Sequence, residues 1–535
     1  MSHVLSRHQL HAFTGMDVPS LLQMRAQSRR DHAFIVWVPF DGPAVTLSYG
    51  EFHARVGRIA GGLKRRSVQR GDALLIHLDN CPEALLAWYA CTWIGAIAVT
   101  TNARAAGDEL AYYAEHSGAV AAITQPRFAE LVASHCPQLR WLAVTSTDNG
   151  DVPASRPDQH SRFDDIDGEP PQRHAPDPLA PCSVQFTSGT TARPKAVLWT
   201  HANALWGARI NATHEDLRPE DVHLVHLPLF HTNAQAYSVL ACLWVGATAV
   251  VVPRFSARRF WPVSLAHGCT WTSVVPFCVK ALMQQDVPAR HSYRLWGSAV
   301  SEPPSDAHFG VKTIGWWGMT ETITHGIVGN PQAPNRPLSI GRPAPEYGIA
   351  IVDDDSVPVR EARPVEGGGS GLLMIRGVRG LSMFHEYLGN ARATADSFDA
   401  DGWFRTGDVV NLYEDGVIQF GDRHKDMLKV GGENVAASEV ERVVLQVAGV
   451  HECALVARKH PMLDEVPVLF VLPAAQAGDD LVERINAACT AQLADFKRPH
   501  EVRLVSELPR STLEKIAKAE LRRLLEAEGA APLAG

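Results

Sequence analysis

The chain has 535 residues, of which 46% are hydrophobic and 20% are charged, and its formal net charge is -8. This length exceeds that of one ordinary domain, while the negative charge, with no basic stripe to offset it, argues against nucleic-acid binding. Residues 1–21 lack the pattern of a signal peptide, and the longest apolar run, Leu85 to Val99, is too short to span a membrane. The nine cysteines are spaced singly, as is typical of reduced thiols, so we expect a cytoplasmic protein without a membrane segment.

Residues 47–123 alternate between helical and strand patterns. Helical spacing of apolar residues predicts helices over Tyr49 to Lys64, Pro82 to Trp93 and Asp108 to His116. Short apolar runs predict strands over residues 73–78, 96–100 and 119–123. This alternation is typical of βαβ units around a largely parallel sheet.

A polar connection, Asp148 to Pro181, leads into the stretch 186–195, which reads Phe-Thr-Ser-Gly-Thr-Thr-Ala-Arg-Pro-Lys. We expect a buried strand before it, over Ser183 to Phe186, and a helix after it, beginning at Thr200 or His201. Hydroxyls and backbone N–H groups can donate to phosphate oxygens, and Lys195 can neutralise their charge. The spacing differs from that of the GxxxxGK[ST] loop. Taken alone, the stretch fits an ordinary surface loop better than a phosphate-binding loop.

The βαβ rhythm resumes after this stretch. Strands are expected over residues 222–227, 247–252, 271–275, 295–299 and 312–317, with helices over 235–244 and 277–285. Between Ile340 and Phe420, short strands with Gly and Asp turns predict a small β-barrel or a distorted sheet, with a hairpin turn at Gly367 to Gly371. Beyond Arg423 a compact α+β segment is expected, with helices over 438–446, 481–493 and 517–526 and strands over 453–457 and 466–472.

Four stretches, in order, resemble motifs of the adenylate-forming superfamily, which contains acyl-CoA synthetases, peptide-synthetase adenylation domains and luciferases. They are residues 186–195, Trp317 to Glu321, Gly402 to Asp408 and Asp422 to Asn434, and a weaker fifth is Leu508 to Lys515. The resemblance covers nearly the whole chain. It implies an α/β fold: a large N-terminal domain of βαβ-type sheets with a small β-barrel-like subdomain, residues 1–423, and a small mobile α+β C-terminal domain, residues 424–535.

The resemblance implies that a carboxylate attacks the α-phosphate of ATP and that pyrophosphate leaves, a reaction catalysed by positioning and charge neutralisation. It assigns Thr320 to the α-phosphate and Glu321 to Mg²⁺, a cation that prefers oxygen ligands. By itself, Glu321 fits an acidic residue at a helix N-terminus equally well. The residues implied for the β- and γ-phosphates are Thr187, Ser188, Gly189, Thr190, Thr191 and Lys195.

By the same resemblance, Asp408 accepts both ribose hydroxyls and Arg423 helps to fix the ribose. Trp317, followed by Gly318, stands where the family has a tyrosine whose ring lies against adenine. Ser298 and Ala299 are expected to line the adenine and acyl sites from a strand end. Without the family, Asp408 would be interpreted as a turn residue and Trp317 as a buried core aromatic.

Lys515 resembles the lysine that reaches the α-phosphate and the carboxylate during adenylation. Lys425 resembles the hinge about which the small domain rotates, bringing Lys429 to the site for the second half-reaction. Ala192 and Ala196 replace usual glycines, so the backbone should avoid positive φ there. Glu514 replaces the glycine before the catalytic lysine; we expect these changes to affect loop mobility and rate more than the fold.

Residues 228–233 and 431–434 look closest to acyl-CoA synthetases, including the carnitine/crotonobetaine-CoA ligase type. The resemblance therefore implies an ATP-dependent carboxylic acid:CoA ligase that uses Mg²⁺, with coenzyme A as cosubstrate; it leaves a homodimer open. No carrier-protein sequence follows Lys515, which disfavours a peptide-synthetase module. A stand-alone enzyme that loads a carrier protein and a nucleotide-binding homologue without turnover remain alternatives. A functionalised or bulky acid is favoured because the candidate acyl-pocket residues mix polar and aromatic groups: His231, Asn233, Gln235, Trp296, Trp316 and Ile323.

Overall fold

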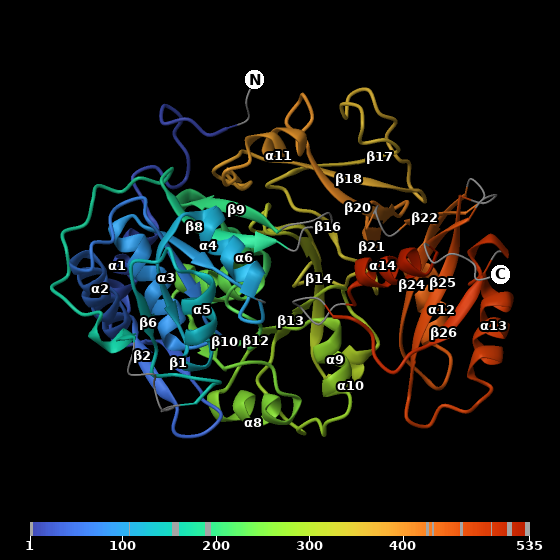
Figure 1. Ribbon diagram of the computed structural model, residues 1–535, viewed down its shortest axis with the longest axis horizontal. Coiled ribbons are helices and arrows are strands. Elements are labelled where there is room, and N and C mark those ends of the chain that lie inside the picture. Colours follow the sequence, from blue (N-terminus) through green and yellow to red (C-terminus); the bar gives the residue numbers. More distant parts are fainter. Residues whose placement is uncertain are drawn as a thin grey trace. The chain divides into compact units, whose positions relative to one another are not determined.

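The computed structural model describes residues 4–105, 107–151, 160–187, 194–423, 427–430, 433–460, 464–493, 495–510 and 516–529. The chain forms two compact units (Figure 1). The first contains Met1–Ile349 and Ile375–Phe404, and the second contains Ala350–Met374 and Arg405–Gly535. The boundaries between the units fall inside three strands, β17 (Gly348–Val352), β18 (Ser370–Arg376) and β20 (Phe404–Leu412). The predicted boundary between residues 423 and 424 separates the large domain from the C-terminal domain that is expected to rotate. This boundary stays a prediction.

The first unit contains an eight-stranded sheet in the order β19-β9-β8-β4-β3-β5-β6-β7. Strands β8 and β3 to β7 pair in parallel, whereas β9 is antiparallel to both β8 and β19. This confirms the predicted parallel βαβ arrangement. The strands are β3 (Ala73–His77), β4 (Ile97–Thr100), β5 (Ala119–Thr124), β6 (Leu142–Val144), β7 (Ser161–Arg162), β8 (Pro181–Thr187), β9 (Lys195–Thr200) and β19 (Glu386–Tyr387).

The predicted helices of this region are present, with ends within two residues of the expected ones: α2 (Tyr49–Arg65), α3 (Pro82–Ile94) and α4 (Gly107–Ser117). A capping box between Ser48 and Glu51 begins α2. Helix α3 is apolar on all sides, and every residue after Pro82 is buried. This fits its position between α1 (Val18–Ser28) and α2 on one side and strands β3, β4 and β8 on the other (Figure 1).

The second sheet of the first unit has nine strands in the order β16-β15-β14-β13-β12-β10-β11-β1-β2. Its centre, from β14 to β1, is parallel, and β2, β15 and β16 add antiparallel edges. Because parallel strands point the same way, the segments that follow β10, β13 and β14 emerge at one edge of the sheet. The strands are β1 (Ala33–Trp37), β2 (Val45–Ser48), β10 (Val222–Val225), β11 (Thr248–Val251), β12 (Trp271–Ser273), β13 (Leu295–Ser298), β14 (Lys312–Gly318), β15 (His325–Val328) and β16 (Arg342–Pro343).

Helix α6 (His201–His214) begins at Thr200, whose hydroxyl accepts from the Asn203 backbone N–H, as the sequence predicted. The preceding strand β9 was not among the predicted elements. It makes the predicted phosphate-binding stretch a connection between two strands and not a turn from a strand to a helix. The helix expected over residues 235–244 is present, but its first part is a π-helix, η3 (Asn233–Leu240), which continues as α7 (Ala241–Val245). π-helical turns are frequent at functional sites.

The second unit contains a four-stranded sheet, β17-β18-β20-β21, with β21 (Ile418–Arg423), which agrees with the distorted-sheet alternative; Gly368 takes a left-handed φ of 88° in the turn before β18. A five-stranded sheet follows. Along β24 and β25, alternate residues enter two separate cores, one shared with α12 and α13 and one shared with α14. These elements are β22 (Met427–Val430), β23 (Glu433–Ala436), β24 (Val450–His460), β25 (Asp464–Pro473), β26 (Glu501–Leu504), α12 (Ala437–Leu445), α13 (Leu481–Gln492) and α14 (Lys518–Gly529).

Candidate functional site

The predicted phosphate-binding stretch connects β8 to β9. The facing residues Thr187 and Lys195 end the pairing, and the Thr187 hydroxyl donates to the Lys195 carbonyl oxygen at 3.4 Å. Ala196 lies in β9 and is not among the residues with positive φ, as expected. The chain therefore leaves the sheet at Thr187 and rejoins it at Lys195. The family resemblance assigns the side chains of both residues to the phosphates. The remaining predicted residues of the stretch lie outside the described residues: Ser188, Gly189, Thr190, Thr191 and Ala192.

Lys195 and Glu321 meet at the ring of Tyr387. The Lys195 ammonium lies 4.5 Å above the ring centroid, and the Tyr387 hydroxyl donates to Glu321 Oε1 at 2.8 Å. Tyr387 pairs with Val197 across β19 and β9, so it shares a sheet face with Lys195, two residues from Val197. Burial, and then the Glu321 charge, raise the pKa of Tyr387, so its hydroxyl stays protonated and donates. The backbone N–H of Phe384 donates to the Glu321 carbonyl oxygen at 2.8 Å and fixes the chain there.

Thr320 is held at its carbonyl oxygen and at its hydroxyl. The Trp199 indole N–H donates to the Thr320 carbonyl oxygen at 3.0 Å. The hydroxyls of Thr320 and Thr232 lie 3.2 Å apart, and Thr232 donates to Gln185 Oε1 at 2.7 Å. Because a hydroxyl has one proton, Thr232 can donate to Gln185 while it accepts from Thr320. Residues from β8, β9 and the start of η3 thus fix the residue predicted to contact the α-phosphate.

The residues predicted for adenine lie at the ends of neighbouring parallel strands. Ser298 is buried at the end of β13, and the next residue, Ala299, is exposed. Trp317 and Gly318 end β14, and the Trp317 side chain is buried. A Cβ at Gly318 would lie 2.5 Å from both the Tyr237 hydroxyl and the Thr324 carbonyl oxygen, so a larger residue would not fit. Since β13 and β14 run in parallel, these residues emerge at the same edge as Thr320.

In the second unit, Asp408 of β20 pairs with Arg423 of β21. Asp408 is 1% exposed, and its N–H donates to the Thr406 hydroxyl at 3.1 Å. The Thr406 hydroxyl in turn donates to the Leu373 carbonyl oxygen at 2.7 Å, which anchors the strand beside the carboxylate. The structure thus places the two predicted ribose-binding residues opposite each other. The backbone of Lys429 pairs with Asn434, while Lys425, Glu514 and Lys515 lie outside the described residues.

Two tryptophans predicted for the acyl pocket lie on opposite faces of the nine-stranded sheet. Trp316 covers Gly297, where a Cβ would lie 1.6 Å from the indole ring, and stacks on His325 with ring centroids 4.2 Å apart. Trp296 packs on the other face against Phe260 of α8 (Ala257–His267), at 5.6 Å between centroids. Side chains alternate along a strand, so neighbouring Trp296 and Gly297 point in opposite directions. The structure does not bring Trp296 and Trp316 to one pocket wall.

Gln235 lines a pocket with about 260 Å³ of space, including the part open to solvent. Its amide Nε2 is buried and has no hydrogen-bond partner within the described residues. His231 and Asn233 lie in the same turn, where the Gln235 N–H donates to the His231 carbonyl oxygen at 3.0 Å. Ile323, with a left-handed φ of 61°, instead packs toward Gly207 of α6. The other pocket walls are mostly apolar and include Ile76, Leu78, Leu85, Trp88, Leu229 and Phe230.

The family profile described as AMP-binding enzyme matches residues 22–388, more than half of the chain. The chain belongs to the AMP-binding enzyme family. The profile of the AMP-binding enzyme C-terminal domain also matches, over residues 439–515. These matches confirm the predicted resemblance to adenylate-forming enzymes and the prediction that the chain is an enzyme.

This AMP-binding enzyme is similar along most of its length to proteins of known activity. A crotonobetaine/carnitine–CoA ligase of Escherichia coli is 34% identical over 494 residues, which cover 89% of this chain and 93% of the ligase. The structure of an anthranilate–CoA ligase in complex with anthranoyl-AMP matches with a TM-score of 0.85 at 23% identity, covering 98% of this chain and 100% of that one. An O-succinylbenzoate–CoA synthetase of Bacillus subtilis with AMP matches with a TM-score of 0.80 at 24% identity, covering 96% and 98%. The structural matches confirm the predicted α/β fold class.

Tyr387 cannot be recognised from the sequence of the AMP-binding enzyme, because it lies 66 residues after Glu321 in a strand of two residues. A buried pair behind Trp316 was not predicted either. Glu215 and His325 are both fully buried, with 3.9 Å between Glu215 Oε1 and His325 Nε2. Neither the carboxyl oxygens nor the ring nitrogens have a hydrogen-bond partner within the described residues. Burial raises the pKa of Glu215 well above and lowers the pKa of His325 well below their usual values, so burial favours the neutral form of each side chain.

Proposed function

We propose that this AMP-binding enzyme ligates a carboxylic acid to coenzyme A at the expense of ATP. The acid attacks the α-phosphate to give an acyl-adenylate and pyrophosphate, and the CoA thiol then attacks the acyl carbon to give a thioester and AMP. The proposal rests on the convergence of Lys195 and Glu321 on the Tyr387 ring. The 34% identity to a CoA ligase over 89% of the chain supports CoA as the acceptor.

The residues at this site fit Mg²⁺ together with ATP. Within the described residues no group of three or more His, Cys, Asp or Glu side chains can hold a metal ion, whereas Glu321 offers one buried carboxylate. Mg²⁺ is commonly bound by one or two carboxylates plus substrate phosphates, and it would neutralise the charge that develops on the departing pyrophosphate. Glu321 would hold the ion, Tyr387 would orient Glu321, and Lys195 would bind a phosphate oxygen. Thr320 would direct its hydroxyl or backbone to the α-phosphate.

The nucleoside of ATP is assigned to the remaining predicted residues. Asp408 would accept the ribose hydroxyls, a role supported by its burial and by its place opposite Arg423. The adenine would lie between the Trp317 ring and the strand ends that carry Ser298, Ala299 and Gly318. The Trp317 side chain is also buried in the protein. We therefore expect its ring to have a structural role as well as to stack on adenine.

Lys515, Lys425 and Lys429 are proposed to act in the two half-reactions through rotation of residues 424–535. Lys515 would lie against the α-phosphate during adenylation and withdraw before the CoA thiol approaches. Lys515→Ala should block formation of the acyl-adenylate but still convert supplied acyl-adenylate to thioester. Lys425→Pro, which restricts the φ angle of the hinge, should do the reverse. Equal loss of both steps in both folded variants would exclude the rotation.

The acid is proposed to be functionalised or bulky, and it would enter beside Gln235, whose buried amide Nε2 has no hydrogen-bond partner within the described residues. Carnitine and crotonobetaine, named in the relative that is 34% identical, are the first acids to test. Trp296 packs in the core on the opposite sheet face from Trp316, so substitutions of Gln235, Asn233 or Trp316 are the better probes of acid selectivity. Gln235→Leu should change the preferred acid, while exchange with the best remaining acid stays measurable.

Acid-dependent exchange of labelled pyrophosphate into ATP, measured over a panel of acids, tests the proposed adenylation. We expect exchange with at least one functionalised acid, followed by thioester formation when free CoA is added. Exchange without a CoA thioester would favour the enzyme that loads a carrier protein. No exchange with any acid would favour the homologue without turnover. We also propose a cytoplasmic location and a homodimer. As a separate finding, none of the described helices has both the length and the apolar composition of a membrane span.

A further inference from the structure

Residues 319–324 connect β14 to β15 and carry Thr320 and Glu321, so the conformation of this connection places both side chains. Its backbone is unusual at Ile323, which has a φ of 61° and is fully buried. Positive φ is disfavoured for a residue with a branched Cβ, because the side chain crowds the backbone. The connection is therefore strained close to Glu321, and the surrounding contacts must hold it in this conformation.

The strained residue is the centre of a γ-turn. The backbone N–H of Thr324 donates to the Thr322 carbonyl oxygen at 2.6 Å, which closes a turn of three residues around Ile323. With a positive φ at its centre, this turn is of the rare and strained form. The Ile323 side chain has room because residue 207 of α6 is glycine: a Cβ at Gly207 would lie 2.8 Å from Ile323 Cγ2. The packing accommodates the side chain, but it does not remove the strain in the backbone.

The hydroxyl of Tyr347 lies at the centre of the contacts that hold this turn. Tyr347 is 8% exposed, and its hydroxyl donates at 2.8 Å to the Thr322 carbonyl oxygen, the acceptor of the γ-turn. The Thr324 hydroxyl lies 2.6 Å from the Tyr347 hydroxyl, and the Trp206 indole N–H donates to it at 3.1 Å. A hydroxyl has one proton and two lone pairs, so it can donate to Thr322 while it accepts from Thr324 and Trp206. Burial raises the pKa of Tyr347, so the hydroxyl keeps its proton.

The same hydroxyl reaches the segment that carries Tyr387. It lies 2.9 Å from the Ser382 carbonyl oxygen, a second acceptor for its proton. Further along this segment, the Phe384 N–H donates to the Glu321 carbonyl oxygen, and the Tyr387 hydroxyl donates to the Glu321 carboxylate. Tyr347 thus joins the two chain segments on which the position of Glu321 depends.

We propose that Tyr347 is a positioning residue for adenylation: its hydroxyl keeps the strained turn in the conformation that presents Thr320 and Glu321. This inference rests on the proposed function, because it concerns the same contacts to Mg²⁺ and the α-phosphate. Tyr347 acts through the backbone of the turn and not on the substrates. Without its hydroxyl, Ile323 is free to relax to a negative φ, and the Glu321 carboxylate moves away from the position where it would hold Mg²⁺.

Tyr347→Phe removes only the hydroxyl and tests this role. The KM for Mg²⁺ in pyrophosphate exchange should rise about tenfold, and kcat per folded molecule should fall by a similar factor, because a buried acceptor of the turn loses its donor. Thermal unfolding shows how much of the variant is folded. Thr324→Val removes the hydroxyl that contacts Tyr347 and should raise the KM for Mg²⁺ about threefold. It carries the test if Tyr347→Phe does not fold.

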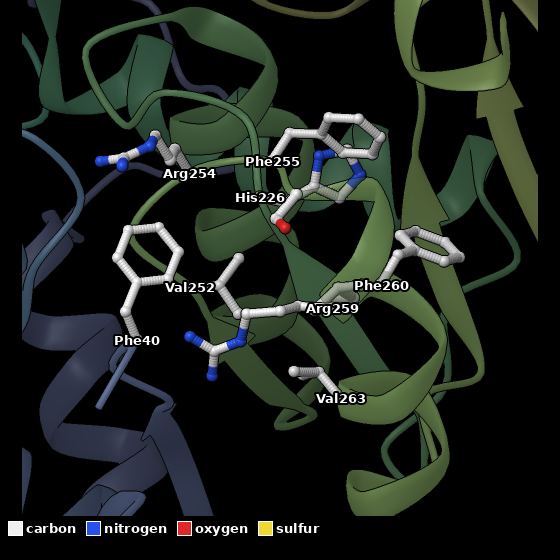
Figure 2. A pocket seen from close by; sticks show the side chains of 10 residues that line it. Phe40, His226, Val252, Arg254, Phe255, Arg259, Phe260 and Val263 are labelled. Atoms are coloured by element: carbon white, nitrogen blue, oxygen red, sulfur yellow. The ribbon is translucent and has the colours of Figure 1, made fainter. Parts of the chain in front are cut away.

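Tyr293→Phe is the matched control. Tyr293 is 7% exposed, and its hydroxyl lies 2.6 Å from the Ser264 hydroxyl. Its ring stacks on Phe260 at 5.7 Å between centroids, and Figure 2 shows Phe260 in the wall of the pocket beside α8, on the opposite sheet face from Trp316. The control therefore also removes a buried tyrosine hydroxyl, but away from the turn. It should lower the melting temperature and leave kcat and the KM for Mg²⁺ unchanged.

Ile323→Gly separates backbone strain from the loss of a hydrogen bond. Glycine adopts a positive φ without steric cost, so the turn should keep its shape without the Tyr347 hydroxyl. In a chain that carries Ile323→Gly, the further change Tyr347→Phe should therefore raise the KM for Mg²⁺ about threefold or less. An equal effect of Tyr347→Phe with and without Ile323→Gly would overturn the proposal, because Tyr347 would then not be opposing strain.

Calorimetric titration with ATP at several Mg²⁺ concentrations gives a readout that needs no turnover. We expect Tyr347→Phe, and not Tyr293→Phe, to shift the Mg²⁺ dependence of ATP affinity. If Tyr347→Phe only lowers the melting temperature and keeps the Mg²⁺ dependence of the unaltered chain, its role is structural and the inference is wrong. If the unaltered chain binds ATP with Mg²⁺ but exchanges no pyrophosphate with any acid, the proposed function fails, while the binding data still decide the role of Tyr347. Absence of ATP binding would overturn both.

Discussion

Two buried glutamates of the first unit occupy opposite kinds of surroundings. Glu321 accepts a hydrogen bond from the Tyr387 hydroxyl, and the Lys195 ammonium lies over the same ring. Glu215 is equally buried, but within the described residues its carboxyl group has no hydrogen bond, and His325 beside it is neutral. An ammonium and a phenol can stabilise a carboxylate, whereas an apolar interior favours the protonated acid. The difference teaches that burial alone does not mark a functional carboxylate; the donors around it do.

The largest effect is expected for Glu321→Gln. The substitution keeps the shape of the side chain but removes the charge proposed to hold Mg²⁺, so pyrophosphate exchange should fall about a hundredfold or more with every acid tested. The Mg²⁺ concentration needed for half-maximal exchange should rise. Glu215→Gln is the matched control and should leave the rate unchanged. If the exchange rate fell with only one acid, Glu321 would be assigned to the acyl site and not to the metal.

Tyr387→Phe should have an intermediate effect. It removes the hydrogen bond to Glu321 but keeps the ring under Lys195, so the KM for Mg²⁺ should rise about tenfold while the KM for ATP at saturating Mg²⁺ changes little. Tyr387→Leu also removes the ring face and should raise the KM for ATP as well. If Glu321→Gln alters the Mg²⁺ dependence and Tyr387→Phe does not, the metal assignment stands and the positioning role of Tyr387 is wrong.

His325→Phe tests the surroundings of Glu215, where His325 is buried beside the carboxyl group. The folded pKa of His325 is lowered by burial, so the unfolded chain binds the extra proton, and stability is lost as the pH falls below the unfolded value of about 6.5. Each pH unit below that value costs about 1.4 kcal/mol for one such group. Phenylalanine keeps the stack on Trp316, so the variant should lose less stability between pH 7 and pH 5 in urea denaturation. Identical pH profiles would mean that His325 is accessible to protons when folded.

The smallest effect is expected for Glu215→Gln. Burial raises the folded pKa of Glu215, so the protonated form is retained on folding, and stability decreases as the pH rises from the unfolded value, near 4.5, toward the folded one. Glutamine cannot ionise, so the variant should melt a few degrees above the unaltered chain at pH 7 to 8. The gain should vanish near pH 4.5. A variant that melts lower at both pH values would indicate that the Glu215 carboxylate has a stabilising partner.

Much of the first unit could be predicted from local sequence patterns. The helices over Tyr49–Arg65 and Pro82–Ile94 and the strands between them follow from the spacing of apolar residues, and the capping residue Thr200 marks the start of α6. Strand β9 escaped prediction because a run of six residues between a polar loop and a helix has no period of its own. It forms because β8 and β19 offer hydrogen bonds on both sides.

The sequence by itself determined the order of the motifs, and with it the family, because Lys195, Glu321 and Asp408 can be recognised from their immediate neighbours. Only the tertiary structure decided which side chains share a site. Strand register placed Tyr387 beside Lys195, and the alternation of side chains along β13 and β14 separated Trp296 from Trp316. The same holds for the surroundings of charged groups: Glu215 and Glu321 are the same residue type, and the groups beside each carboxyl come from parts of the chain that are distant in sequence. Hydrogen bonds and desolvation act over a few ångströms in space, whatever the separation along the chain.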